Sequence, residues 1–167
     1  FTVPEVRMMI RLVVKVRRNG YWWPTEDVMR AVHGVVSFWA PELVLTRTSR
    51  GGEKEVFLIV YDGPVEEFQG RWCFPGGYNR WAEPDIQTTC SRVARREIGV
   101  NVIYLGILHA EKWKSGEHPY GVPLSVFVGC KPAGRVRFTK KRRFFPVRQL
   151  PKPIVQIHRR FIEQHLG

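Results

Sequence analysis

Apolar and polar residues follow two different periods along this chain. At residues 6–16 every even position is apolar, while the odd positions include Arg7, Arg11 and Lys15. A period of two is typical of a strand with one buried face, so we predict a strand over this segment. Because an unpaired edge strand favours aggregation, we expect it to pair at a sheet edge or across a homodimer.

The chain continues with a short predicted helix and then a group of strands. The segment 24–27 supplies a cap and first-turn acidic residues for a helix that ends near Gly34. A hairpin turn is expected at residues 49–52, because this segment contains two consecutive glycines. Strands are predicted around the turn at residues 35–39, 42–47 and 55–61.

The second half combines one central helix with further strands. Pro84 and Asp85 open a helix that closes at Gly99 and carries Ile86 and Cys90 on its apolar face. Strands are expected at residues 102–108, 124–130, 135–138 and 144–147, and a last helix at 154–166. Strands surrounded by two principal helices indicate a domain of the α+β class.

Composition narrows the class of protein. The chain has 167 residues, of which 44% are apolar and 13% aromatic, as expected for one globular domain with a sizeable core. It contains no uncharged apolar run of about 18 residues, so we expect no membrane-spanning segment and no membrane partner. Three cysteines without Cys-x-x-Cys spacing argue against a disulfide framework or a zinc site, and they fit a reducing compartment, the cytoplasm.

The net charge is +12, and much of it is concentrated in one segment. Seven basic residues and no acidic residue lie between positions 131 and 143. Such a segment attracts RNA, other polyanions or an anionic ligand. A solvated loop or strand edge gives the same pattern, and the sequence does not decide between the two.

The segment 74–100 combines a glycine turn, a glutamate and a basic helix. Gly76 and Gly77 let the backbone turn sharply and approach a ligand closely, because no Cβ intervenes. The further residues of the motif are, in order, Glu83, Arg92, Glu97, Gly99 and Val100. Positions 93 and 97 are four residues apart and share one face of the predicted helix.

This order of residues resembles the signature of the Nudix hydrolase family. The lead-in at residues 72–77 and the segment 143–151 also resemble the family, and the resemblance covers roughly residues 35–166. It implies a Nudix-type α/β/α sandwich, with a mixed β-sheet between helices, for residues 35–167. Residues 1–34 would pack on this domain or extend it.

The resemblance implies a role for several residues of the motif. Glu83 and Arg92 would form a structural ion pair that pins the loop to the helix. The family holds magnesium, with manganese as the alternative, through several carboxylates, of which this helix keeps only Glu97 beside Arg96. Glu97 and the Gly77 carbonyl would therefore hold the metal. Without the family context, Glu97 is simply a helix glutamate paired with neighbouring arginines.

One branch of the family has a similarly reduced helix. The GDP-mannose mannosyl hydrolases carry a single metal-binding glutamate there, and residues 92–99 of this chain look similar position for position. The similarity implies a substrate of the GDP-sugar type. The branch supplies a metal-binding Gln and a catalytic His where this chain has Thr139 and Lys140. We therefore take His118 as the candidate base, against the alternative of a solvated loop histidine.

The remaining candidates concern the ligand and the overall function. The residues expected to contact a nucleotide are Gly76 and Gly77 through the backbone, Trp81 by stacking on a base, and Arg96, Lys140 and Arg142 on the diphosphate. We interpret the chain as a Nudix-like hydrolase of a nucleoside-diphosphate-linked substrate. Two alternatives stay open: a catalytically inactive module that binds nucleotide or RNA through basic residues replacing the metal charge, and a vestigial pocket beside an interaction or dimerisation strand in residues 1–34.

Overall fold

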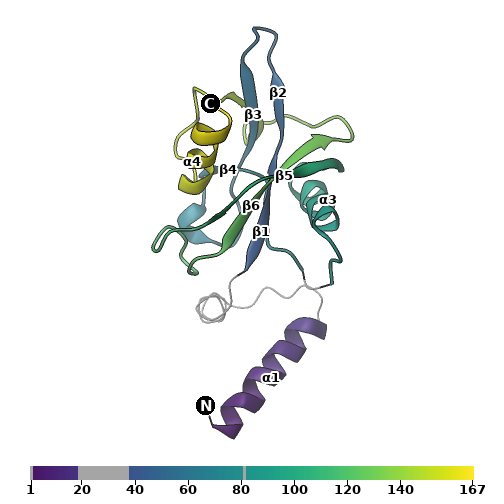
Figure 1. The fold of residues 1–167 in the computed structure, drawn as a ribbon, viewed down its shortest axis with the longest axis vertical. Coiled ribbons are helices and arrows are strands. Elements are labelled where there is room, and N and C mark those ends of the chain that lie inside the picture. The colour runs from purple at the N-terminus through teal and green to yellow at the C-terminus, as the bar shows by residue number, and fades with distance from the viewer. Residues whose placement is uncertain (1, 19–37, 81) are drawn as a thin grey trace.

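The computed structural model of the chain describes residues 2–18, 38–80 and 82–167 (Figure 1). The helices are α1 (Val3–Arg18), α3 (Ile86–Glu97), α4 (Gln156–His165) and the 3-10 turn η1 (Glu66–Phe68). The strands are β1 (Trp39–Val44), β2 (Thr46–Thr48), β3 (Lys54–Val60), β4 (Trp72–Cys73), β5 (Val102–Lys112), β6 (Leu124–Pro132) and β7 (Arg142–Pro146). The short helix predicted to end near Gly34, and most of the strand predicted at residues 35–39, lie outside the described residues.

The strands form two sheets that lie between the helices. In the first sheet β1 runs parallel to β6, and β5 runs antiparallel to β6, in the order β1-β6-β5. In the second sheet β3 pairs antiparallel with β2, β4 and β7. Figure 1 shows α3 and α4 on opposite sides of the strands. The α+β sandwich with mixed strand directions is therefore confirmed.

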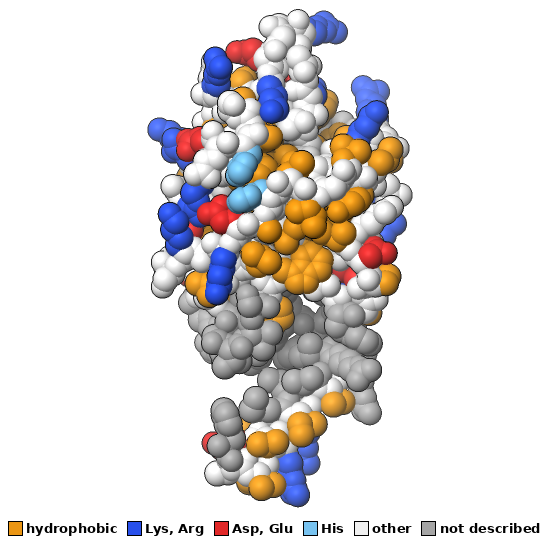
Figure 2. All heavy atoms as spheres, in the orientation of Figure 1, with side chains coloured by type: hydrophobic (Ala, Val, Ile, Leu, Met, Phe, Trp, Pro, Cys, Tyr) orange, Lys and Arg blue, Asp and Glu red, His pale blue; other side chains and the backbone are white. Residues whose placement is uncertain are grey.

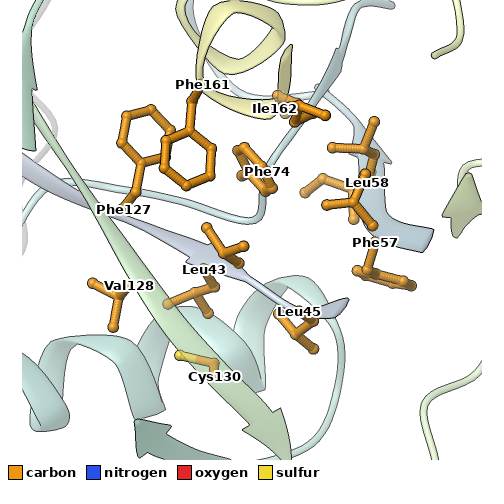
Figure 3. Close-up of a cluster of buried hydrophobic side chains, with 14 of the residues drawn as sticks. Leu43, Leu45, Phe57, Leu58, Phe74, Phe127, Val128, Cys130, Phe161 and Ile162 are labelled. Atoms are coloured by element: carbon orange, nitrogen blue, oxygen red, sulfur yellow. The ribbon is translucent and has the colours of Figure 1, made fainter. Parts of the chain in front are cut away.

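An aromatic cluster attaches α4 to the first sheet (Figure 3). The rings of Phe127 on β6 and Phe161 on α4 stack with their centroids 4.0 Å apart. Phe74, just before the glycine turn, contacts each of these rings edge-on at 5.8 Å. Because all three side chains are fully buried, each stabilises the fold by about 1.5–3 kcal/mol, and together they hold the glycine turn against α4.

Helix α3 begins and ends where its sequence predicts. Asp85 is the N-cap, and its Oδ1 accepts a hydrogen bond from the Thr88 N–H at 2.7 Å. At the other end Gly99 has φ +76° and donates its N–H to the Ala94 carbonyl at 3.1 Å. This left-handed conformation suits glycine and closes the helix.

The strand predicted at residues 6–16 is wrong, because these residues lie in helix α1. Val6, Ile10 and Val14 are four residues apart, so the apolar pattern also has the helical period. The Glu5 carboxylate accepts hydrogen bonds from the Thr2 N–H and Oγ1, at 2.6 and 2.9 Å, which caps the helix start. Figure 2 shows apolar and basic side chains on different sides of α1. The homodimer was predicted from the pairing of an edge strand at residues 6–16, and a helix there gives no support to that prediction.

The basic strand predicted at residues 135–138 is also wrong, since the structure places no strand there. The chain instead turns at Thr139, whose N–H donates to the Arg142 carbonyl at 2.9 Å, and β7 starts at Arg142. Arg47 packs on the rings of Phe138 and Phe144, which holds this turn against β2 without a strand ladder. Among the described helices, none combines the length and apolarity needed to cross a bilayer.

The closing glycine of α3 gives a stability prediction. We expect Gly99→Ala to lower the free energy of unfolding by about 1 kcal/mol, because an L side chain disfavours the positive φ. Gly134→Ala is the matched control, since its new Cβ meets only Val100 at an ordinary 3.5 Å. Urea unfolding of both variants checks the difference, and equal stabilities would contradict the assigned backbone conformation.

Candidate functional site

A cleft of about 470 Å³ opens beside the Gly76–Gly77 turn. Its size lies in the range of small-molecule sites. Charged and polar side chains from several parts of the fold line it, among them Glu42 on β1, Asp62 after β3, Arg96 and Glu97 on α3, Ser125 on β6, Arg142 on β7 and His158 on α4. The cleft therefore forms only when both sheets and both helices are assembled.

Most of the residues predicted for the site meet at this cleft. Those that line it are Gly76, Gly77, Arg92, Arg96, Glu97, His118 and Arg142. Glu83 lies behind the wall, where it binds Arg92. Lys140 is exposed in the turn before β7 and is not a lining residue, and Trp81 lies outside the described residues.

The predicted ion pair between Glu83 and Arg92 is present. Arg92 donates through Nε to Glu83 Oε1, and through Nη2 to Glu83 Oε2 at 3.1 Å and to the Tyr78 carbonyl at 2.8 Å. Burial would raise the pKa of Glu83, but hydrogen bonds from Arg92, the Arg80 N–H and Thr89 outweigh it, so this pKa lies below its ordinary value of 4.5. The ion pair fastens the loop after the glycine turn to α3.

Arg96 occupies the position in which the family motif leads one to expect a metal. Its Nη2 donates to the Gly76 carbonyl at 3.0 Å, and its Nε donates to Glu97 Oε1 at 2.5 Å. The carbonyl that Arg96 binds is that of Gly76, and the role of the Gly77 carbonyl as a metal ligand stays a prediction. Within the described part of the chain, no three His, Cys, Asp or Glu side chains form a metal-binding group. With Arg96 in this place, the residues do not fit a magnesium or manganese ion.

A buried polar network at the floor of the cleft was missed by the sequence interpretation. Glu42 Oε1 accepts from Ser125 Oγ at 3.1 Å, and Ser125 Oγ accepts from Trp113 Nε1 at 3.0 Å. The Phe74 N–H donates to His158 Nδ1 at 3.1 Å, so Nε2 carries the ring proton, 3.4 Å from Glu42 Oε2. Glu42 is therefore a buried carboxylate with a hydrogen bond from Ser125 on one oxygen and the His158 ring beside the other.

The only sequence signal for this network was an acidic residue inside an apolar strand. Glu42 sits between Pro41 and Leu43 on β1, where an unpartnered carboxylate would be costly. His158 lies in the segment predicted as the last helix, and nothing in that pattern distinguishes it from an ordinary helix residue. Its partner Phe74 is 84 residues away, and Ser125 is 83 residues from Glu42. These two hydrogen bonds therefore cannot be predicted from neighbouring residues in the sequence.

His118, the predicted base, is a buried part of the cleft wall. Its Nδ1 accepts from the Tyr120 N–H at 3.1 Å, and its Nε2 lies 3.4 Å from the Tyr78 hydroxyl. Its ring also packs edge-on against Trp113 with centroids 4.8 Å apart. These contacts engage both ring nitrogens and fix the ring, which favours a positioning role for His118. Its role as a base stays a prediction.

Aromatic side chains form another part of the wall. Tyr61, Phe68 and Tyr78 line the cleft, and the rings of Tyr61 and Phe68 meet edge-on at 5.8 Å. Burial raises the pKa of Tyr61 and of Tyr78 well above the ordinary value, so both hydroxyls stay protonated and can donate hydrogen bonds. The cleft thus offers flat apolar surfaces with neutral donors beside its arginines.

Comparisons with known proteins agree with the observed fold and with the order of residues in the motif at 74–100. The family model described as the NUDIX domain matches residues 41–165. No curated protein sequence matches the chain. The solved structures described below are at most 18% identical to it in sequence, so they carry information about the fold alone.

Three of these structures illustrate the likeness. The NUDIX domain of Shewanella oneidensis NrtR, in complex with ADP ribose, has a TM-score of 0.57 and 18% identity, with 84% of this chain and 96% of that chain covered. A UDP-X diphosphatase has a TM-score of 0.58 and 15% sequence identity, with 98% of this chain and 82% of that chain covered. A longer chain of Shewanella oneidensis NrtR has a TM-score of 0.58 and 17% sequence identity, with 76% of this chain covered. The match covers 60% of that chain, so this protein spans less than two thirds of its length.

The Glu83–Arg92 ion pair predicts a pH-dependent stability. We expect Glu83→Gln to lower the free energy of unfolding at neutral pH by about 2 kcal/mol, because Arg92 is left buried without its counter-charge. Since the folded pKa of Glu83 is depressed, this contribution is fully present above pH 4.5 and is lost as the pH falls through the folded pKa.

Denaturant unfolding between pH 7 and pH 3 measures this difference. Glu163→Gln is the control, because its partner Arg159 is exposed and such pairs contribute under about 1 kcal/mol. A stability difference for Glu83→Gln that stays constant down to the lowest pH would contradict the assigned role.

Proposed function

Because the chain belongs to the NUDIX domain family, we propose that its cleft binds and hydrolyses a nucleoside diphosphate linked to a further group. The first candidate substrate class is a GDP-sugar, which the residues at 92–99 suggest. Structures of similar fold include one bound to ADP ribose and one named a UDP-X diphosphatase, and both names describe a nucleoside diphosphate joined to another group. These names support the substrate class without deciding the nucleotide.

The observation that carries this proposal is the mixture of arginines and aromatic rings in one cleft. Arg96 and Arg142 both line it, while Arg92 is engaged by Glu83. A guanidinium group binds phosphate oxygens through two parallel hydrogen bonds, and a tyrosine or phenylalanine ring stacks on a nucleobase. Arg96 and Arg142 would hold the diphosphate, and Tyr61 and Tyr78 would form the surface for the base.

Glu42 is our candidate for the group that accepts a proton from the attacking water. Ser125 donates a hydrogen bond to its carboxylate at the cleft floor, and His158 Nε2 lies 3.4 Å from its other oxygen. Its Oε2 also lies against Gly76, because a Cβ built on that glycine would be 2.2 Å from this oxygen. A positioned carboxylate beside the diphosphate site is suited to general base catalysis. Glu97 and His118, the catalytic candidates of the motif, would then act by charge and by positioning.

A second candidate function is a catalytically inactive module that binds nucleotide or RNA. The observation in its favour is the basic segment 131–143, in which Lys131, Arg135, Arg137, Lys140, Lys141 and Arg143 are all exposed. No acidic residue lies among them to neutralise this charge. Such a surface attracts a phosphate backbone and depends strongly on salt.

The cysteines support a reducing, cytoplasmic compartment for this function. Cys73, Cys90 and Cys130 are all free and buried. Burial raises the pKa of Cys73, a lining residue of the cleft, well above its ordinary value, so this thiol is a poor nucleophile. We therefore assign the thiols to packing and not to the chemistry of the site.

The hydrolase proposal is tested by product formation from GDP-mannose, UDP-glucose and ADP-ribose, each with and without magnesium. We expect at least one to be hydrolysed, and Glu42→Gln to lower its turnover by about 100-fold with nucleotide binding retained. Glu163→Gln is the control, because it removes an exposed carboxylate of α4 outside the cleft. A folded protein that binds these compounds and releases no product would leave the second candidate.

The RNA proposal is tested by the salt dependence of binding to single-stranded RNA. We expect Lys140→Ala combined with Lys141→Ala to reduce the slope of log K against log salt by about 1.4, because two phosphate contacts are lost. Lys152→Ala, an exposed lysine outside the segment, should leave the slope unchanged. Fluorescence anisotropy measures these slopes. Parent protein without measurable RNA binding at low salt would exclude this function and leave the small-ligand proposal intact.

A further inference from the structure

Arg96 connects the last turn of α3 to the glycine turn at the edge of the cleft. Its guanidinium donates to the Gly76 carbonyl at 3.0 Å and to the Glu97 carboxylate at 2.5 Å. We propose that this guanidinium is a resident cation of the site: it takes the position between these two oxygens and binds the diphosphate of the ligand without a divalent metal. This inference rests on the proposed binding of a nucleoside diphosphate, and it adds which group neutralises the negative charge of the diphosphate.

The glycine turn is shaped to admit the Arg96 side chain. A Cβ built on Gly77 would come within 2.9 Å of Arg96 Nη2, closer than real Cβ contacts allow. The absence of a side chain at Gly77 therefore gives the guanidinium its place beside Gly76. The contact involves the same Nη2 atom that donates to the Gly76 carbonyl, so both observations describe one arrangement.

The guanidinium retains donors for a ligand. It has five N–H groups in one plane, and the contacts to Gly76 and Glu97 use two of them. The Arg96 side chain is 44% exposed and lines the cleft, so its free edge can be reached from the solvent side. Phosphate oxygens are the acceptors that match this planar edge best, because two of them can be bound side by side.

The charges around the cleft require a cation at this point. Glu42, Asp62 and Glu97 all line it, and a diphosphate brings further negative charge. Arg92 is held by Glu83, which leaves Arg96 and Arg142 as the lining guanidinium groups that face the ligand. A divalent ion at the Gly76 carbonyl and Glu97 would meet the positive guanidinium within contact distance. Metal and Arg96 therefore compete for one position, and either one excludes the other.

Two binding measurements test this competition on the full chain. The first is titration calorimetry with GDP-mannose and with GDP, in chelator and in magnesium. The second is Mn²⁺ binding followed by electron paramagnetic resonance, without nucleotide. The variants are Arg96→Gln and Glu97→Gln. Arg95→Gln is the control, because it removes the same charge from the exposed neighbouring position of α3, which does not line the cleft.

For the parent protein we expect equal nucleotide affinity in chelator and in magnesium, and no Mn²⁺ site. Arg96→Gln should weaken nucleotide binding in chelator by about 10- to 100-fold, because charge-assisted hydrogen bonds are lost. It should also create an Mn²⁺ site that Glu97→Gln in the same chain removes again. Arg95→Gln should change nothing. The melting temperature of each variant identifies any loss of fold.

Two results would overturn the inference: nucleotide binding by the parent that requires magnesium, or an Arg96→Gln protein that is folded and has unchanged affinities for nucleotide and Mn²⁺. Failure of the proposed function looks different. If no nucleotide binds to the parent under either condition, the ligand proposal fails, and with it the diphosphate role of Arg96. The Mn²⁺ measurement still decides whether the guanidinium occupies a latent cation position.

Discussion

The contact on which the site depends is the ion pair between Arg92 and Glu83. Arg92 also donates to the Tyr78 carbonyl, so one guanidinium ties both ends of the loop after the glycine turn to the middle of α3. Arg96 lies four residues further along the same helix and therefore one turn closer to the helix end. With the loop fixed by Arg92, the Gly76 carbonyl falls within hydrogen-bond distance of Arg96. A charge pair in and behind the wall of the cleft thus contributes to the geometry inside it.

The second constraint on the site is the free-energy cost of burying negative charge. Glu42 is nearly excluded from solvent, and an isolated carboxylate there would cost several kcal/mol. Ser125 and His158 offset this cost by facing one oxygen each, while Glu97 is balanced by Arg96. Two of the carboxylates that line the cleft are therefore supported in different ways: Glu42 by the Ser125 hydroxyl, with the His158 ring beside it, and Glu97 by a full positive charge.

Local signals predicted the parts of the fold that depend on nearby residues. Asp85 and Gly99 delimit α3 because capping is decided within one turn, and most strands were found because their apolar period is two. The same period failed at residues 6–16, where apolar spacings of two and of four overlap. There the Thr2 and Glu5 cap, a signal of the helical alternative, was the decisive residue pair. At 135–138 a period of two over four residues was too short to specify a strand.

The sequence by itself determined the α+β class and the position of α3, because both follow from residue type and short spacing, and its resemblance to the family motif implied the Glu83–Arg92 pairing and the loss of a motif carboxylate at Arg96. Only the tertiary structure brought Glu42, Ser125 and His158 together, since these side chains come from β1, β6 and α4. It also showed that the Arg96 guanidinium lies against the Gly76 carbonyl and Glu97, whereas the sequence showed only that a carboxylate of the motif is absent at this position. The direction of a long side chain depends on what it packs against, and no spacing rule contains that information.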